Sequence, residues 1–213
     1  RRDYLYYSGA ERVLDFPANL FEGGVRGAKY QSNDLAHTGN FSVRNENPRD
    51  RVFEIEFGRK DYEGKYKVSF WTNKTQDGKE KEAKLFVERD GAGIEVLEPS
   101  EVVDAGCWQL QNYYVDIFFD NSQMNYIKFF VSNRSYAGQF FDDFRFHPVY
   151  SRVNSYVYND HTDELTYMLN ENNFATAYKY DKAGRLIKTY SEVPNDRSFV
   201  GGLKVVSKNN YKY

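Results

Sequence analysis

Asp142 is the residue whose chemistry the sequence constrains most. It lies in the stretch FFDDFRF at residues 140–146, in the same alternating phase as Phe140, Phe144 and Phe146. A carboxylate on an apolar strand face is costly to bury alone, so it needs an ionic partner, hydrogen bonds or a bound cation. The sequence therefore predicts a polar or metal-binding environment around Asp142.

Aromatic residues with polar neighbours form a second candidate site. A flat ring can stack on a sugar ring while amides and hydroxyls orient the sugar hydroxyl groups. These residues would instead be buried if loops or the tyrosine-rich C-terminal residues covered them, so packing is the alternative. Strand alternation directs these candidate ligand-binding residues away from the expected core: Trp71, Ser69, Asn73, Phe86, Tyr114 and Phe130.

No arrangement typical of an enzyme accompanies these residues. His37, His147 and His161 lack metal-ligand spacing, and no nucleophile elbow or phosphate-binding glycine loop is present. The single cysteine, Cys107, cannot form an internal disulfide. We therefore expect a non-catalytic module.

The composition excludes several classes of partner. The 213 residues carry a net charge of −2 with charges of both signs interspersed, which does not favour nucleic acid or an anionic membrane. We expect no membrane span, because no apolar run is long enough. The chain lacks an initial Met and an apolar signal segment near its start, so we expect a processed protein or a piece of a longer one.

Elements that would position these residues are β-strands throughout. Aromatic residues make up 18% of the chain and favour strands. Residues 51–57, 64–75, 112–121 and 125–133 alternate or end at turn residues, and no convincing helix lies between them. The expectation is an all-β protein: an N-terminal segment at residues 1–13, an antiparallel β-sandwich at residues 14–150, and a β-hairpin region at residues 151–213.

The order of motifs in the sandwich resembles the galactose-binding-like jelly rolls, which include carbohydrate-binding modules of secreted bacterial glycoside hydrolases. The motifs are AHTGNFSV at 36–43, GKYKVSFWTNKT at 64–75, CWQLQNYYV at 107–115, YIKFFVSN at 126–133 and FFDDFRFHP at 140–148. The resemblance implies a structural Ca²⁺ between the His-Thr-Gly turn and Asp142, with oxygens near Thr38 and an N-terminal acid such as Glu22 as further ligands. The alternative is an Asp142 that is salt-bridged or bonded to backbone amides.

A second resemblance covers the C-terminal residues. YKYDKAGRL at 178–186 is similar to the YD or RHS repeats of large bacterial surface proteins, and YVYNDHTDEL at 156–165 is a diverged copy about 21 residues earlier. Gly184 suits a tight turn, because glycine takes positive φ without strain. One hairpin is marginal alone, so these units must lean on one another, on the sandwich or on other parts of the parent protein.

Together these features lead to two expectations. The first is a carbohydrate-binding module of an extracellular or cell-surface bacterial protein, with a glycan and other parts of the parent protein as partners. The alternative is a structural, adhesive or protein-interaction spacer without a glycan ligand. An open surface at Trp71 favours the first, and a Trp71 covered by the C-terminal residues favours the second.

Overall fold

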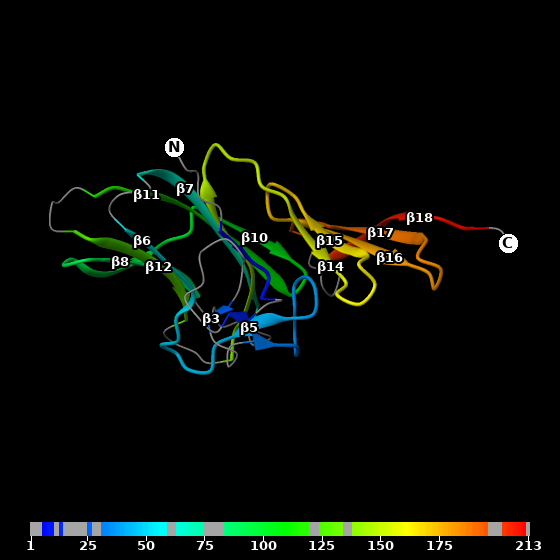
Figure 1. Ribbon diagram of the computed structural model, residues 1–213, viewed down its shortest axis with the longest axis horizontal. Helices are drawn as coiled ribbons and strands as arrows, with labels where there is room; N and C mark the ends of the chain where they lie inside the picture. The colour runs from blue at the N-terminus through cyan, green and yellow to red at the C-terminus, as the bar shows by residue number, and fades with distance from the viewer. Residues whose placement is uncertain are drawn as a thin grey trace.

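The structure, a computed structural model, describes residues 6–10, 13–14, 25–26, 31–58, 63–74, 83–119, 124–133, 138–195 and 202–211. These residues form strands and turns (Figure 1), which confirms the predicted all-β class, and they contain no helix that could span a membrane. The strands are β1 (Tyr6–Ser8), β2 (Val13–Leu14), β3 (Val25–Arg26), β4 (Gln31–Ser32), β5 (Ser42–Arg44), β6 (Val52–Gly58), β7 (Gly64–Asn73), β8 (Lys84–Arg89), β9 (Gly93–Leu97), β10 (Glu101–Ala105), β11 (Trp108–Ile117), β12 (Tyr126–Ser132), β13 (Phe140–Pro148), β14 (Ser155–Tyr158), β15 (Leu165–Leu169), β16 (Ala175–Tyr180), β17 (Leu186–Glu192) and β18 (Leu203–Lys208).

Two antiparallel sheets form a β-sandwich. The larger sheet has the order β10-β11-β7-β13-β5-β4, with β1 also paired to β13, and the smaller has the order β6-β12-β8-β9. A short parallel pair, β2 and β3, forms a separate two-stranded sheet. Because β1 pairs with β13, residues 6–8 of the expected N-terminal segment belong to the larger sheet.

The core lies between these two sheets and consists mainly of aromatic and branched side chains. Phe57 of β6 lies 5.0 Å from Phe146 of β13 between ring centroids, and Phe53 lies 4.9 Å from Phe144. Burying one such side chain stabilises the fold by about 1.5–3 kcal/mol. The inward faces predicted for β6, β7 and β12 all line this core: Phe53, Ile55, Phe57, Tyr66, Val68, Phe70, Ile127, Phe129 and Val131.

Strand β13 reverses its alternation at Asp143. Asp142 lies opposite Trp71, but the next registered pair is Arg145 with Ser69, and Asp143 has a φ of +46°. One extra residue in a strand forms a bulge that exchanges the two faces. Asp142 therefore shares the outer face with Phe140, as predicted, whereas its predicted alignment with Phe144 and Phe146 is wrong, because both point into the core.

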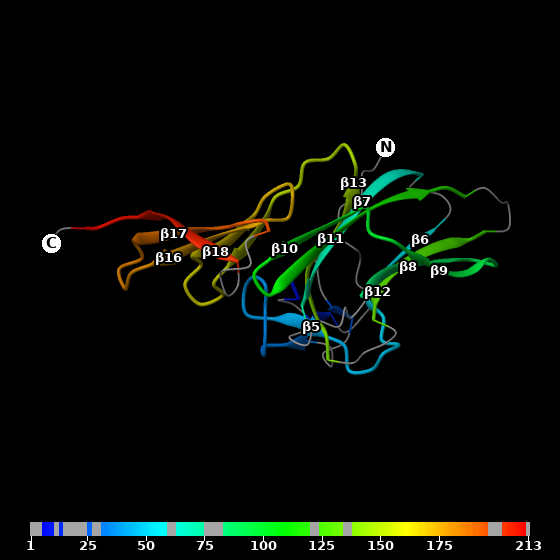
Figure 2. The same ribbon diagram turned by 180° about the vertical axis from the view of Figure 1, so that it is seen from behind.

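The C-terminal residues form one antiparallel sheet whose five strands, β14 to β18, follow chain order. Figure 2 shows β16, β17 and β18 of this sheet projecting away from the sandwich. Successive turns therefore lie at opposite ends of this sheet. The turns after β15 and β17 contact the sandwich, where the Asn195 amide donates to the Asp104 carbonyl at 2.6 Å. The turns after β14 and β16 lie at the far end (Figure 1). The sheet thus meets the sandwich with its strand ends rather than with a face.

Two hairpins of this sheet have equivalent pairing. Tyr158 lies opposite Leu165 and Tyr180 lies opposite Leu186, each next to a shift in register. The turns between them contain six and five residues, which accounts for the offset of about 21 in the sequence.

The two turns also use the same hydrogen bonds. The side chain of Asn159 accepts from the His161 amide at 2.9 Å, and that of Asp181 accepts from the Ala183 amide at 2.9 Å. Asp163 and Gly184, near the end of each turn, have φ values of +57° and +73°. Asparagine and aspartate close such turns with their own side chains, so the first hairpin folds like the second without its Gly-Arg pair.

Candidate functional site: a buried charged cluster at the seam

Trp71 is fully buried, which matches the alternative in which the C-terminal residues cover it, so it is not open to a sugar. Its strand phase is correct, since it lies on the outer face of the larger sheet, but the turn after β15 covers it. The indole N–H donates to the Asn173 carbonyl at 2.9 Å, and Phe174 contacts the ring edge-on at 5.8 Å between centroids. We call this contact between the outer face of the larger sheet and residues 169–175, 192–195 and 202 the seam.

The other predicted sugar-contacting residues do not form one surface. Ser69 is buried at the seam, and the half-buried Asn73 accepts from the Phe140 amide at 2.9 Å. Phe86 and Phe130 lie in the smaller sheet, where their rings stack at 5.3 Å and both are buried. Tyr114 lies on the same face as Trp71 and is 58% exposed, so it is the member of this set that solvent reaches most readily.

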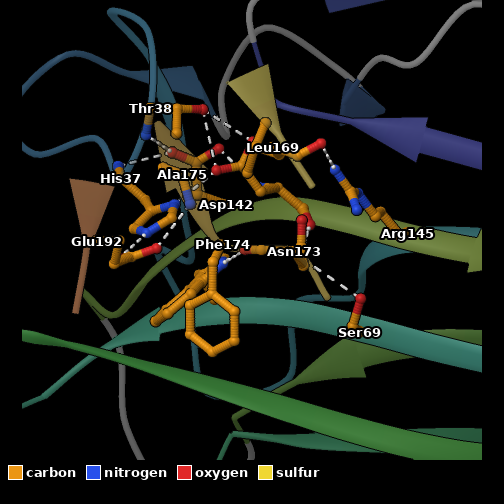
Figure 3. A network of polar contacts seen from close by, with 12 residues as sticks. His37, Thr38, Ser69, Asp142, Arg145, Leu169, Asn173, Phe174, Ala175 and Glu192 are labelled. Atoms are coloured by element: carbon orange, nitrogen blue, oxygen red, sulfur yellow. Dashed lines mark hydrogen bonds and ion pairs between the residues drawn. The ribbon is translucent and has the colours of Figure 1, made fainter. Parts of the chain in front are cut away.

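Asp142 is surrounded by backbone amides. Its carboxylate accepts from the amides of His37 at 2.8 Å, Thr38 at 3.3 Å and Asp143 at 2.7 Å (Figure 3). These bonds match the alternative in which amides satisfy Asp142, and they fix the turn at residues 37–38 against β13. The Thr38 hydroxyl donates to the neighbouring carboxylate of Asp143 at 2.9 Å.

This donor set does not fit Ca²⁺ among the described residues. Calcium takes six to eight oxygen ligands, whereas the groups that converge on Asp142 are N–H donors, whose positive ends would face a cation. Glu22, the expected acidic ligand, lies outside the described residues. The calcium site that the resemblance implies is therefore untested as a whole, although backbone amides already satisfy the carboxylate of Asp142.

His37 connects the two parts of the molecule. One ring nitrogen, Nδ1, lies 2.6 Å from Asp143 of β13, and Nε2 lies 2.8 Å from Glu192 of β17 (Figure 3). The ring also stacks on Trp71 with centroids 4.1 Å apart. The second oxygen of Glu192 accepts from the Ala175 amide at 2.9 Å, so this carboxylate is held from both sides.

The two carboxylates keep His37 positively charged. Burial alone lowers the pKa of His37, but the charges and hydrogen bonds of Glu192 and Asp143 outweigh burial and raise this pKa to about 10. Burial, and next the charge of Asp143, raise the pKa of Asp142 well above its usual value, against the opposing effect of His37. The side chains of His37, Asp143 and Glu192 are at most 2% exposed, so they cannot reach a substrate in this conformation.

Arg145 and Asn173 complete the seam. The Arg145 guanidinium donates to the carbonyls of Asn170 at 2.5 Å and Leu169 at 3.1 Å, where β15 ends and the following turn begins. The side-chain Nδ2 of Asn173 donates to the Asp143 carbonyl at 2.9 Å. Asn173 has a φ of +66°, a conformation that asparagine tolerates better than most residues. The Asn170 carbonyl also accepts from the Asn173 backbone amide at 2.9 Å, so the Arg145 guanidinium ties a turn that is already hydrogen-bonded to the sandwich.

Sequence reasoning missed Glu192, Asn173 and the ionic role of His37. His37 was noticed as part of the His-Thr-Gly turn, but its partner Glu192 lies 155 residues away and belongs to another sheet. Strand phase carries no information about such a contact. A weak signal was available at Asn173, since Asn-Asn before a strand is typical of a tight turn.

Compared with models of known protein families and with curated proteins, the chain matches none.

Proposed function

We propose that this chain is a non-catalytic structural unit of an extracellular or cell-surface bacterial protein, in which the β-sandwich holds the hairpin sheet in one fixed orientation. The observation that carries this proposal is the ionic cluster of His37, Asp143 and Glu192, whose members come from both parts and are buried between them. The jelly-roll and YD-repeat resemblances support the bacterial surface origin, and other parts of the parent protein are the expected partners.

A buried charged cluster favours a rigid connection for a physical reason. Sliding or rotating the sheet while the seam stays closed would leave a charged group buried without its partner, which is strongly destabilising, by about 3–5 kcal/mol. A hydrophobic contact alone could slide or rotate with a smaller penalty, because it has no preferred direction. Trp71 adds a directional hydrogen bond to the same contact. The seam therefore suits a spacer that transmits orientation better than it suits a flexible tether.

Differential scanning calorimetry of the whole chain tests this role. We expect one cooperative transition, because the sandwich and the hairpin sheet share the seam. Trp71→Ala removes a fully buried side chain at the seam, so the hairpin sheet should lose its order outside the transition of the sandwich and the calorimetric enthalpy of that transition should fall. Tyr114→Ala, on the exposed part of the same face, should keep one transition with the wild-type enthalpy. Two separate transitions in the wild-type chain would contradict the proposal.

Carbohydrate binding by the sandwich is the second candidate, and Tyr114 is the observation that favours it. The exposed Tyr114 ring lies beside Asn112, whose side-chain oxygen is buried without a partner among the described residues. The side-chain Nδ2 of Asn112 donates to the Glu101 carboxylate at 3.1 Å. The exposed ring of Tyr114 therefore lies next to an amide and a carboxylate. A glycan array, probed in calcium and in chelator, should show a ligand that Tyr114→Ala no longer binds.

A further inference from the structure

Three lysines lie directly opposite one another across the last three strands of the hairpin sheet. Lys179 of β16 is registered with Lys188 of β17, and Lys188 is registered with Lys208 of β18. Registered residues share a sheet face, so the three side chains project to the same side. Neighbouring strands are about 4.7–4.9 Å apart, and this sets the spacing of the row across the sheet. We call these residues the lysine row.

The positive charge of the lysine row is not balanced by the sheet itself. Within β16, β17 and β18 the single carboxylate is that of Glu192, which is buried at the seam against His37. Among the described residues, none of the three lysines forms an ion pair, although Lys179 and Lys208 are exposed. Like charges directly opposite each other destabilise a sheet. The repulsion within the lysine row therefore lowers the stability of the free protein, and binding of an anionic partner would relieve it.

Two tyrosines lie beside the row on the same face. Tyr167 of β15 and Tyr190 of β17 are both registered with Ala177, which is one alternation step from Lys179. Both tyrosines are half-buried, and the small side chain of Ala177 is buried between them. Aromatic faces next to fixed positive charges can contact a sugar ring while the ammonium groups bind its acidic substituents.

We propose that this face binds a carbohydrate chain that carries carboxylate or sulfate groups. The chain runs across the strands, with acidic groups on the lysine row and a sugar ring against Tyr167 and Tyr190. An acidic polypeptide fits less well, because an extended peptide adds to a sheet edge whereas this row lies on a face. Nucleic acid is the alternative that the experiment distinguishes, because the same lysines could bind its phosphates as point charges. The binding goes beyond the structural role and does not depend on it.

Binding of the whole chain to immobilised polysaccharides tests the proposal. Heparin serves as the sulfated probe, polygalacturonate as the carboxylated probe and dextran as the neutral control. The wild-type chain should bind the first two, more weakly at high salt because salt screens exposed charges, and should not bind dextran. Lys188→Gln should weaken binding by about tenfold or more, as expected for loss of a hydrogen bond to a charged group. The triple variant Lys179→Gln, Lys188→Gln, Lys208→Gln should abolish it.

Two variants control for charge and for location. Lys204→Gln removes a lysine from the same strand, but Lys204 is registered with Ser191 on the opposite face, so binding should be unchanged. Tyr114→Ala should also leave it unchanged, which separates this face from the candidate site on the sandwich. Lys188→Gln should raise the melting temperature slightly while it weakens binding, because it relieves the repulsion, so unfolding cannot explain the loss.

Equal affinities of the wild-type chain and the triple variant would overturn the proposal. Binding of polyglutamate or duplex DNA as tightly as heparin would overturn the assignment to carbohydrate, because it would show a surface that accepts any polyanion. Loss of binding in Tyr190→Ala with the lysine row intact would support contact with a sugar ring.

Discussion

His37 stabilises the folded protein through its positive charge. The pKa of His37 is about 10 in the folded protein, against 6.5 for an unperturbed histidine. A group whose pKa is raised by folding contributes stability that is complete below its unfolded pKa and is lost as the pH rises through the folded pKa. We expect the melting temperature of the wild type to exceed that of His37→Gln most near pH 6, and the difference to shrink as the pH approaches 10. Circular dichroism melts across this range provide the measurement.

His161 is the matched control for this experiment. Its side chain is 85% exposed in the turn after β14, near Asp160. The difference in melting temperature between the wild type and His161→Gln should stay close to zero across the same pH range. A difference for His37→Gln that does not change with pH would contradict a charged His37 at the seam.

Asp142 leads to a prediction about calcium. Because three amides satisfy its carboxylate, we expect the same melting temperature in calcium and in chelator. A ligand that binds only the folded state raises stability by mass action, so a calcium-dependent increase would restore the metal site of the jelly-roll resemblance. In either case Asp142→Ala should destabilise the fold by about 1–3 kcal/mol, because it leaves buried amides unpaired.

At the residue scale, the sequence was most informative at residues that break the expected pattern of apolar and polar side chains along a strand. A carboxylate in an aromatic strand required partners, and Asp142 has them. The outward phase of Trp71 was also correct, but phase does not show whether another element covers a face. Glu192 could not be anticipated, because a buried charge and its partner are related only through the tertiary fold.

At the scale of elements, two glycines of the hairpin sheet should respond differently to substitution. Both have positive φ, +69° for Gly202 and +73° for Gly184. A Cβ on Gly202 would lie 2.9 Å from the backbone carbon of Ala105, whereas at Gly184 the nearest atom is a Glu164 side-chain oxygen at 3.6 Å. We expect Gly184→Ala to lower the free energy of unfolding by about 1–2 kcal/mol through backbone strain alone. Gly202→Ala should lower it more, because the backbone of β10 must also move. Urea denaturation measures both, and equal losses would argue against close contact at Gly202.

Strand assignment from alternation succeeded where the period of two was unbroken, as in β7 and β12, and in β6 over Ile55 to Phe57, beyond the bulge at Phe53, whose φ is +52°. It failed within β13, because a single residue at positive φ, Asp143, exchanges the two faces. Aspartate adopts this conformation more readily than most residues, but nothing in the stretch FFDDFRF shows which aspartate does so. The equivalence of the two hairpins could be predicted from the sequence, because the residues that form each turn are close together in the chain.

At the scale of the molecule, the hairpin sheet should not fold by itself. Three of its buried residues, Leu169, Ala175 and Glu192, lie at the seam, where Arg145 and His37 of the sandwich contact Leu169 and Glu192. We expect residues 151–213 alone to melt without a cooperative transition, and the whole chain to melt cooperatively. A cooperative, monomeric transition of the isolated fragment would contradict this. The all-β class followed from the sequence, but the way in which strand ends dock on the outer face of the larger sheet did not.

Successive turns alternate between the two ends of the hairpin sheet. Whether the number of strands is odd or even therefore decides at which end the chain leaves the sheet. With five strands, β14 leaves the seam and β18 also runs away from it, so the sheet projects the chain outward (Figure 1). A sheet with one strand more or fewer would return the chain to the sandwich, whereas the addition of a complete hairpin would extend the sheet sideways and keep the exit direction. Length variants of this architecture should therefore differ by even numbers of strands if they are to present whatever follows at the same end.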